Sequence, residues 1–267
     1  MSKREIVRRL WFVALAVALV APIFVQPLGY PSNYDFRYFI AWIEAGRRSL
    51  LWYGDFPLWN PWTCGGQVYL ANPQSTIAAP TFLLALLFGT ALGTKLMLVA
   101  YLFFAQDGMY RLARHLELDE DGAMLAAIVF AGSGWLGLHL SSGHLNFAGA
   151  ALFPYLMLCH RRAIDEWEWA IPLGALMAWI VGLGGTTTPA MATVFLALSA
   201  IVETIRRRSA RPAIVLLGAA LAAIVIGGMR LLPVSTSRPP AWKRRRYPSA
   251  CHRRAASRRR RRRRDSP

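Results

Sequence analysis

Cysteine is scarce in this chain, which has three among its 267 residues: Cys64, Cys159 and Cys251. The sequence has no CxxC pair and no cysteine and histidine spacing of the kind that binds zinc. Cys159 falls inside an apolar run, so only Cys64 is placed to face an oxidising compartment. These absences exclude a disulfide framework and a structural zinc site of the usual kinds.

Acidic residues are also few, with 14 Asp and Glu against 31 Lys and Arg and a formal net charge of +17. The imbalance is concentrated from Ser235 onward, where 14 of the basic residues and one acidic residue lie. The preceding body therefore has 17 basic and 13 acidic residues, a net charge of +4. Arginine density in a tail is by itself a weak signal, so we do not expect a nucleic-acid partner.

Apolar residues are abundant instead. They make up 55% of the chain, whose mean hydropathy is +0.33, and they come in long blocks, as membrane spans require. We predict an all-α membrane protein with about seven transmembrane helices and the lipid bilayer as a partner. A cleaved signal peptide is the alternative for the first run, but no clean cleavage motif follows it. The predicted spans are 10–27, 96–112, 123–140, 148–159, 169–183, 189–205 and 213–229.

The distribution of basic residues between the spans predicts their direction, because segments rich in Lys and Arg stay in the cytoplasm. With the N-terminus in the cytoplasm, the outer segments hold only Arg37, Arg47, Arg48 and Lys95. The inner segments then hold Lys3, Arg4, Arg8, Arg9, Arg111, Arg114, Arg161, Arg162, Arg206, Arg207, Arg208 and Arg211. This orientation places the segments 35–74, SSGHLNF (141–147) and GGTTT (184–188) together on the outer face.

The segment 35–74 is too long for a plain connector, since unstructured loops beyond about 12–15 residues are usually functional or disordered. It holds four tryptophans, whereas disordered segments are poor in aromatics. We predict a long structured first extracytoplasmic loop. Within it, 35–49 has an apolar stripe typical of an interfacial helix, and 56–72 is rich in turn residues. After the loop, 80–88 is predicted to be a short helix at the membrane edge. The stripe consists of Phe36, Phe39, Ile40 and Ile43.

Several motifs in and beyond this loop resemble the YfhO-like bacterial membrane proteins, which belong with the GT-C-type glycosyltransferases. The motifs are PLWNP (57–61), a Gly pair (65–66), ANPQ (71–74), GMYRLARHLEL (108–118), FAGSGW (130–135) and GHLNF (143–147). The resemblance covers about residues 10–234. Such families continue with more spans and often an outer C-terminal domain, so we expect 1–234 to be a partial GT-C-like membrane domain of a bacterial cytoplasmic (inner) membrane.

The resemblance implies transfer of a sugar from a polyprenyl-phosphate carrier to an extracytoplasmic glycan, lipid or protein acceptor. It implies an acidic residue early in the first outer loop as base or metal contact, and the matching position is Asp35. A carboxylate there can take the proton of the attacking hydroxyl, and Arg or a divalent cation would stabilise the departing phosphate. The metal itself is left open, and no other cofactor is expected. The alternative is that Asp35 only caps the helix that follows it.

The other candidate residues have structural alternatives as well. The substrate-binding candidates are Asp55, Trp59, Asn60, Asn72, Gln74, His144 and Arg37. Trp59, Trp62 and Tyr69 can stack on a sugar or form an interfacial aromatic belt. Asn60, Asn72 and Gln74 can contact substrate or bond the loop backbone, Asp55 suits a turn, and Arg37 suits lipid headgroups. His144 is a substrate or phosphate contact or a satisfied interfacial histidine.

The tail 235–267 disagrees with an odd number of spans, because it would place a run of arginines outside. Three explanations remain open: the last span does not cross, the tail is a polybasic arm, or it is read out of frame. We expect it to be disordered.

The rival function is a non-catalytic membrane protein for transport or envelope assembly. A transporter would show polar residues at mid-membrane, and of these we note only Gln106 and Asp107, near one span end. An inactive truncated fragment is a further alternative.

Overall fold

The computed structural model describes residues 3–25, 29, 35–63 and 65–236. The tail from residue 237 onward, which we expected to be disordered, lies outside the described residues, as do Cys64 and Cys251.

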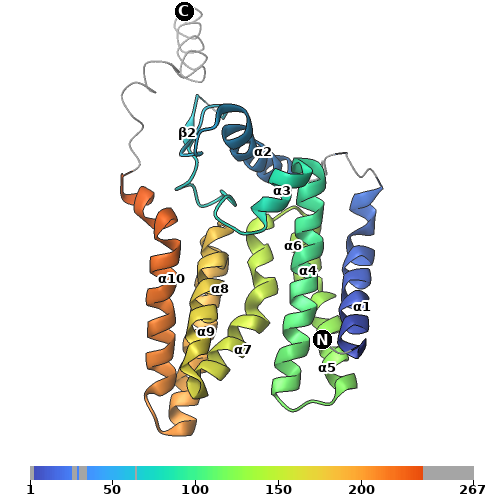
Figure 1. The fold of residues 1–267 in the computed structure, drawn as a ribbon, viewed down its shortest axis with the longest axis vertical. Helices are drawn as coiled ribbons and strands as arrows, with labels where there is room; N and C mark the ends of the chain where they lie inside the picture. Colours follow the sequence, from blue (N-terminus) through green and yellow to red (C-terminus); the bar gives the residue numbers. More distant parts are fainter. Residues whose placement is uncertain (1–2, 26–28, 30–34, 64, 237–267) are drawn as a thin grey trace, which may run out of the picture.

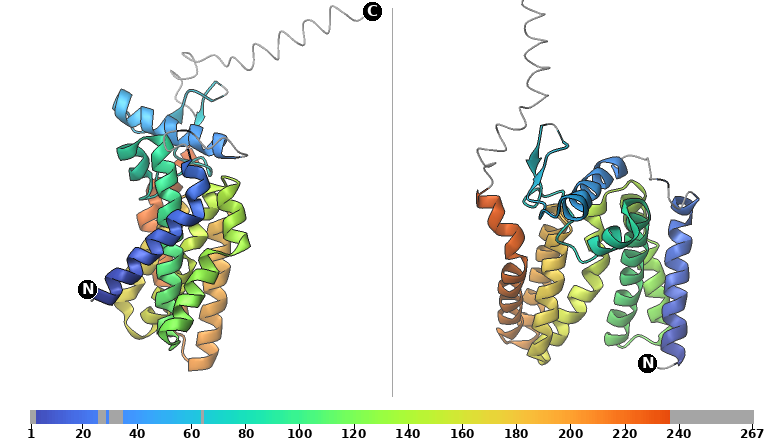
Figure 2. Two further views of the ribbon diagram at one scale, coloured as in Figure 1. Left: turned by 90° about the vertical axis from the view of Figure 1, so that its right-hand side faces the viewer. Right: turned by 45° about the horizontal axis from the view of Figure 1, so that its top comes forward.

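Helices that run along one axis form most of the molecule (Figure 1). Successive helices of the bundle alternate in direction, except that α6 continues the direction of α5 (Figure 2). They are α1 (Lys3–Val20), α4 (Thr90–His115), α5 (Glu120–Ala131), α6 (Gly134–Ser141), α7 (Phe153–Asp165), α8 (Ala170–Gly182), α9 (Thr187–Arg207) and α10 (Arg211–Thr236). Short 3-10 segments complete them: η1 (Ala21–Phe24), η2 (Leu145–Leu152) and η3 (Trp167–Trp169).

Within the described residues, four helical segments are long and apolar enough to cross a membrane: Lys3–Phe24, Glu120–Ser141, Thr187–Arg207 and Arg211–Gly228. The other predicted spans are also helical but shorter or more polar. One expectation needs correction: 148–159 begins as the 3-10 segment η2 and becomes α-helical only at Phe153. The glycine-rich predicted span 123–140 is broken at Gly132, and Ser133 caps the second piece by accepting from the Leu136 backbone N–H (3.5 Å).

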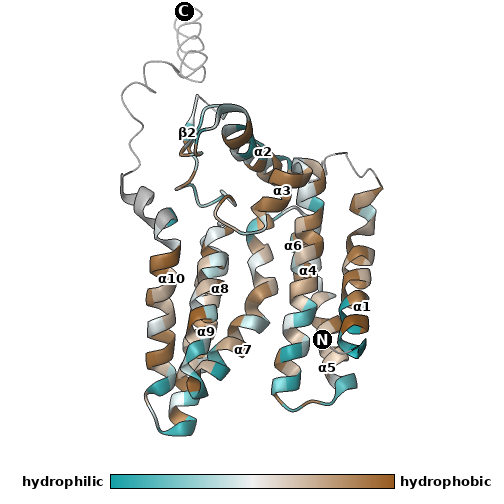
Figure 3. Ribbon diagram, viewed as in Figure 1, coloured by the Kyte–Doolittle hydropathy of each residue, from teal (hydrophilic) through white to brown (hydrophobic). Residues whose placement is uncertain are grey.

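The two ends of the bundle differ in composition, with apolar residues between them (Figure 3). We call the end where α1 begins the arginine end, because the predicted inner basic residues from Lys3 to Arg211 gather there. The opposite end carries the segment from Asp35 to Phe88, and we call it the loop end (Figure 1). This separation is what the alternation of charged and apolar segments in the sequence predicts.

The loop end is built from α2 (Phe36–Tyr53), α3 (Phe82–Phe88) and an antiparallel hairpin of β1 (Trp59–Asn60) and β2 (Gln67–Val68). The predicted apolar stripe of α2 is confirmed, because Phe36, Phe39, Ile40 and Ile43 are all buried. The helix runs four residues beyond the predicted range and ends at Gly54, whose left-handed backbone terminates it. The hairpin was not predicted, since two-residue strands leave almost no periodic signal.

The core has two main parts. One joins α1, α2, α3, α4, α6 and η2, and the other joins η2, α7, α8, α9 and α10. Contacts of α4 with α7 and η2 connect them. The loop-end elements pack into the first part, so the surface that they form is positioned by the bundle itself.

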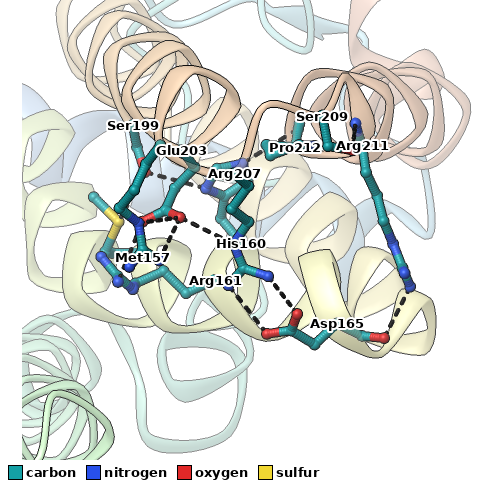
Figure 4. A network of polar contacts seen from close by, with 11 residues as sticks. Met157, His160, Arg161, Asp165, Ser199, Glu203, Arg207, Ser209, Arg211 and Pro212 are labelled. Atoms are coloured by element: carbon teal, nitrogen blue, oxygen red, sulfur yellow. Dashed lines mark hydrogen bonds and ion pairs between the residues drawn. The ribbon is translucent and has the colours of Figure 1, made fainter.

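A polar network fastens α7, α9 and α10 together at the arginine end (Figure 4). Glu203 is 3% exposed and contacts the guanidinium groups of Arg161 (3.2 Å), Arg206 (2.7 Å) and Arg207 (3.1 Å). Arg207 also binds Asp165 at 2.5 Å. A buried carboxylate needs such compensation.

The expectation that Gln106 and Asp107 are the only polar groups of this kind inside the predicted spans was incomplete. Glu203 and His139 also lie within predicted spans.

Candidate functional site

Three segments that the sequence placed on one face meet at the loop end. Asp35 begins the first loop, and its backbone N–H donates to the Ser142 carbonyl at 3.2 Å. Thr188 donates its hydroxyl to the Asn146 carbonyl at 2.8 Å. The Gly185 N–H donates to the Pro73 carbonyl. The first loop, SSGHLNF and GGTTT therefore form one continuous hydrogen-bonded surface.

Asp35 and His144, both predicted site residues, contact each other on this surface. Asp35 Oδ2 lies 3.1 Å from His144 Nε2, and the two side chains are 56% and 33% exposed. His144 Nδ1 in turn lies 3.0 Å from Nδ1 of His139, at the end of α6. The three side chains form a chain of contacts from carboxylate to imidazole to imidazole.

Aromatic side chains hold the histidines in this arrangement. The His139 ring stacks on Phe147, with centroids 4.2 Å apart and planes 7° from parallel. The Trp135 ring packs edge-on against the His139 ring, with the two centroids 4.6 Å apart. The turn also helps, because the His144 N–H donates to the His139 carbonyl at 3.0 Å. Packed rings lose rotamer freedom in advance, which preorganises the site.

Gly143 allows the close approach of the two segments. Its φ is +82°, in the left-handed region that glycine adopts without strain. A Cβ at this position would collide with the backbone nitrogen and the ring of Phe36. Because Phe36 is the first residue of α2, this glycine sets how closely Asp35 approaches His144.

The hydrogen-bond chemistry of imidazole limits the protonation states of the site. A contact between two Nδ1 atoms needs one N–H and one lone pair. If the His144 Nε2–H faces the carboxylate and His144 is neutral, its Nδ1 accepts from His139. If His144 is cationic, its Nδ1–H donates to His139, and the Asp35 carboxylate stabilises the charge. The contacts of the cluster therefore accommodate one added proton on the imidazole pair, beside the Asp35 carboxylate.

The Asp35 side chain does not cap α2, which was the alternative role for this residue. Asp35 occupies the N-cap position of α2 but makes no side-chain capping hydrogen bond. Its carboxylate points to His144 instead.

The amides of the loop act within the loop. Asn60 is 1% exposed, accepts from the Trp62 N–H at 3.0 Å and donates to the Thr63 hydroxyl at 2.9 Å. The Asn72 side-chain oxygen accepts from the Gln74 N–H at 2.8 Å. The side-chain oxygen of Gln74 is buried and has no hydrogen-bond partner among the described residues. Asn60 and Asn72 thus stabilise local turns of the loop.

The aromatic candidates separate into buried and exposed side chains. Tyr69 is wrong as a sugar-stacking residue, because it is 1% exposed and donates its hydroxyl to the Trp42 carbonyl at 2.5 Å. Burial raises its pKa well above the usual range. The Trp59 ring packs against Gly66, and its Nε1 is buried without a partner among the described residues. Trp62 is 46% exposed beside Tyr53, so it keeps a face for a ligand.

The charged candidates of the loop are exposed. Asp55 follows the α2 terminus in a turn, as the alternative for it expected, and Arg37 lies on the outer side of α2. Asp55 lies at the opposite end of α2 from the Asp35 cluster. The described residues do not contain a group of three or more His, Cys, Asp and Glu side chains placed to hold a metal ion. The two Nδ1 atoms of the cluster are occupied with each other.

Sequence reasoning missed two residues of this end. His139 has a signal, since it lies five residues before His144 and at the end of a helix, where its ring can meet the following turn. Arg230 is 6% exposed and donates to the carbonyls of Ser75 (2.6 Å), Gly182 (2.7 Å) and Asn72 (3.0 Å). No local pattern predicts these long-range bonds.

No family model matches the chain, and no curated protein or solved structure is significantly similar to it.

Proposed function

We propose that this chain is a multi-pass membrane protein of GT-C type that transfers a sugar from a polyprenyl-phosphate carrier to an acceptor at the loop end. The observation that carries the proposal is the contact of the Asp35 carboxylate with the His144–His139 pair. An acid–base group of this kind, exposed beside an apolar bundle, suits a reaction between a lipid carrier and a polar acceptor.

The surface of the bundle supports its place in a membrane. In the four long apolar segments only 17–28% of the residues are buried. Large apolar side chains such as Val129, Leu198 and Val225 are 58–81% exposed. An apolar surface of this extent is not stable in water and marks a lipid or protein contact. With the arginine end in the cytoplasm, the Asp35 cluster lies on the outer face of a bacterial inner membrane.

The proposed reaction uses the cluster as a base. The acceptor hydroxyl oxygen forms a bond to the anomeric carbon while the bond from that carbon to the carrier phosphate breaks. The phosphate leaves with the electron pair. The hydroxyl proton passes to an oxygen of the Asp35 carboxylate, which His144 holds in place through its contact with Asp35 Oδ2. A phosphate is already a stable leaving group, so it needs little protonation by an acid. A positive charge that stabilises the departing phosphate is more useful.

A cavity near the loop end suits the carrier lipid. Its volume is about 460 Å³, and it lies between α8, α10 and the segment around Pro80. Apolar side chains such as Leu176, Trp179 and Ile226 line it, and Arg230 lies among the lining residues. Among the described residues, the hydrogen-bond acceptors of Arg230 are carbonyl groups, which carry no formal charge. A cation beside an apolar cavity is complementary to an isoprenoid chain that ends in a phosphate.

The test is sugar transfer from a radiolabelled polyprenyl-phosphate sugar by the full chain in vesicles. Asp35→Asn keeps the shape of the side chain and removes the base, so transfer should fall by roughly 10²-fold or more. Asp121→Asn makes the same chemical change in an exposed first turn at the arginine end and should transfer at the wild-type rate.

Membrane insertion of both variants is measured in the same preparations. Transfer by Asp35→Asn at the rate of Asp121→Asn would contradict the proposal. It would favour the non-catalytic alternative, a transport or envelope-assembly protein.

A further inference from the structure

A second cavity lies at the arginine end, far along the bundle from the Asp35 cluster. Its volume is about 530 Å³, and α1, α4, α7 and η3 contribute its walls. The lining residues are Arg8, Tyr110, Arg111, Arg114, His115, Tyr155, Leu158, Cys159, Arg162 and Trp169. Four of these are arginines, and none carries a carboxylate.

The neighbouring carboxylates do not neutralise these arginines. Asp107 binds Arg111 at 2.6 Å and accepts from the Tyr155 hydroxyl. Glu5 lies 4.0 Å from Arg8 and 3.8 Å from Arg111, but it also binds Arg9 at 3.0 Å. Among the described residues, Arg8 and Arg111 share Glu5 and Arg111 also binds Asp107, whereas Arg114 and Arg162 form no ion pair. The remaining positive potential also acts on His115: burial lowers its pKa, Arg162 and Arg161 lower it further, and Asp165 raises it.

Aromatic rings position two of the guanidinium groups. Arg8 lies 4.1 Å from the Tyr110 ring centroid, and Arg162 lies 4.6 Å from that of Trp169. Stacking of this kind fixes the plane of the guanidinium while leaving N–H groups for another acceptor. Arg8 Nε is buried and has no hydrogen-bond partner among the described residues.

We propose that this cavity binds the phosphate headgroup of an anionic membrane phospholipid. The cavity lies where the apolar bundle meets its charged end, which is the depth at which lipid headgroups lie in a membrane. Leu158 and Cys159 add apolar groups to its lining, and Trp169 is typical of the membrane interface. A soluble anion would use the arginines but not these apolar walls. Basic cavities between membrane helices on the cytoplasmic side bind headgroups in this manner.

The experiment measures retained lipid. The full chain is purified in neutral detergent, exposed to mixed phosphatidylglycerol and phosphatidylcholine, and examined by native mass spectrometry. Wild type should retain phosphatidylglycerol in preference to phosphatidylcholine. The double variant Arg8→Gln/Arg162→Gln should weaken retention by about fivefold for each arginine removed, roughly 25-fold in all.

Matched variants distinguish a site from general surface charge. Arg4→Gln/Arg208→Gln removes two exposed arginines from the same end and should retain lipid as wild type does. Arg8→Lys/Arg162→Lys keeps the charge and should retain most of the binding, which guards against a folding defect in the Gln variant. Equal loss in both Gln variants, equal retention of the two lipids, or inorganic phosphate binding as well as phosphatidylglycerol would each overturn the proposal.

Discussion

The role of Asp35 could be narrowed to two alternatives from the sequence, and its contacts in the structure favour one of them. Its position before an apolar helix suited both a helix cap and a base. Its contact with His144 at 3.1 Å and the lack of a side-chain cap favour the second role. The residues are more than 100 positions apart, so no local pattern could decide between the alternatives. Tyr69 shows the converse, because a tyrosine in a polar loop turned out to be part of the core.

We expect His139 to affect the rate of sugar transfer through its contact with His144, and not through its packing. His139→Phe keeps a flat ring against Phe147 and Trp135 but removes both nitrogens. We expect sugar transfer to fall by roughly 10²-fold, the lower part of the range for acid–base groups, and its pH profile to change shape. Thermal unfolding should stay close to wild type. A normal rate with an unchanged pH profile would mean that the second histidine is only a packing residue.

Gly143 should be intolerant of any side chain. Gly143→Ala places a Cβ against Phe36 and forces a positive φ on alanine, which costs about 1–3 kcal/mol. The melting temperature should drop, and transfer should fall with it as Asp35 moves away from His144. The control is Gly137→Ala in α6, where a Cβ meets nothing within 4 Å. There alanine should be neutral or stabilise by about 0.5–1 kcal/mol. Equal effects at the two positions would contradict this account.

At the scale of elements, one carboxylate adds a polar contact to the apolar packing of α2 against the bundle. Glu44 accepts from the Thr90 hydroxyl at the start of α4 and binds Arg48 at 2.6 Å. Burial raises its pKa, but the hydrogen bonds from Thr90 and Arg48 outweigh burial, and the net shift is downward. The sequence predicted the helix from its apolar stripe, whereas this polar contact joins residues 46 positions apart.

The lowered pKa of Glu44 predicts a pH dependence of stability. A carboxyl whose folded pKa lies below its usual value of 4.5 stabilises the fold fully above that value. The contribution is lost as the pH falls through the lowered pKa. The melting temperature in detergent, followed by circular dichroism, should therefore fall on acidification, and Glu44→Gln should show a smaller fall. An identical pH dependence in the variant would show that Glu44 does not hold α2.

At the scale of the whole molecule, the separation of charge between the two ends predicts topology. A phosphatase reporter that is active only outside the cytoplasm should be active when fused after Gly65. The same reporter should be inactive after Ser209, which follows the arginines at the end of α9. The reverse pattern would invert the orientation and place the Asp35 cluster in the cytoplasm.

The helical class, most of the long helices, the apolar face of α2 and the grouping of three polar segments at one end could be predicted from the residues alone. These features follow from local composition and periodicity, because the backbone in an apolar environment must satisfy its own hydrogen bonds as helix. Three features could not be predicted in this way: the contact of Asp35 with His144, the bonds of Arg230 to the Asn72–Ser75 segment, and the burial of Tyr69. Such contacts join residues tens to more than a hundred positions apart, and packing of the whole bundle brings them together.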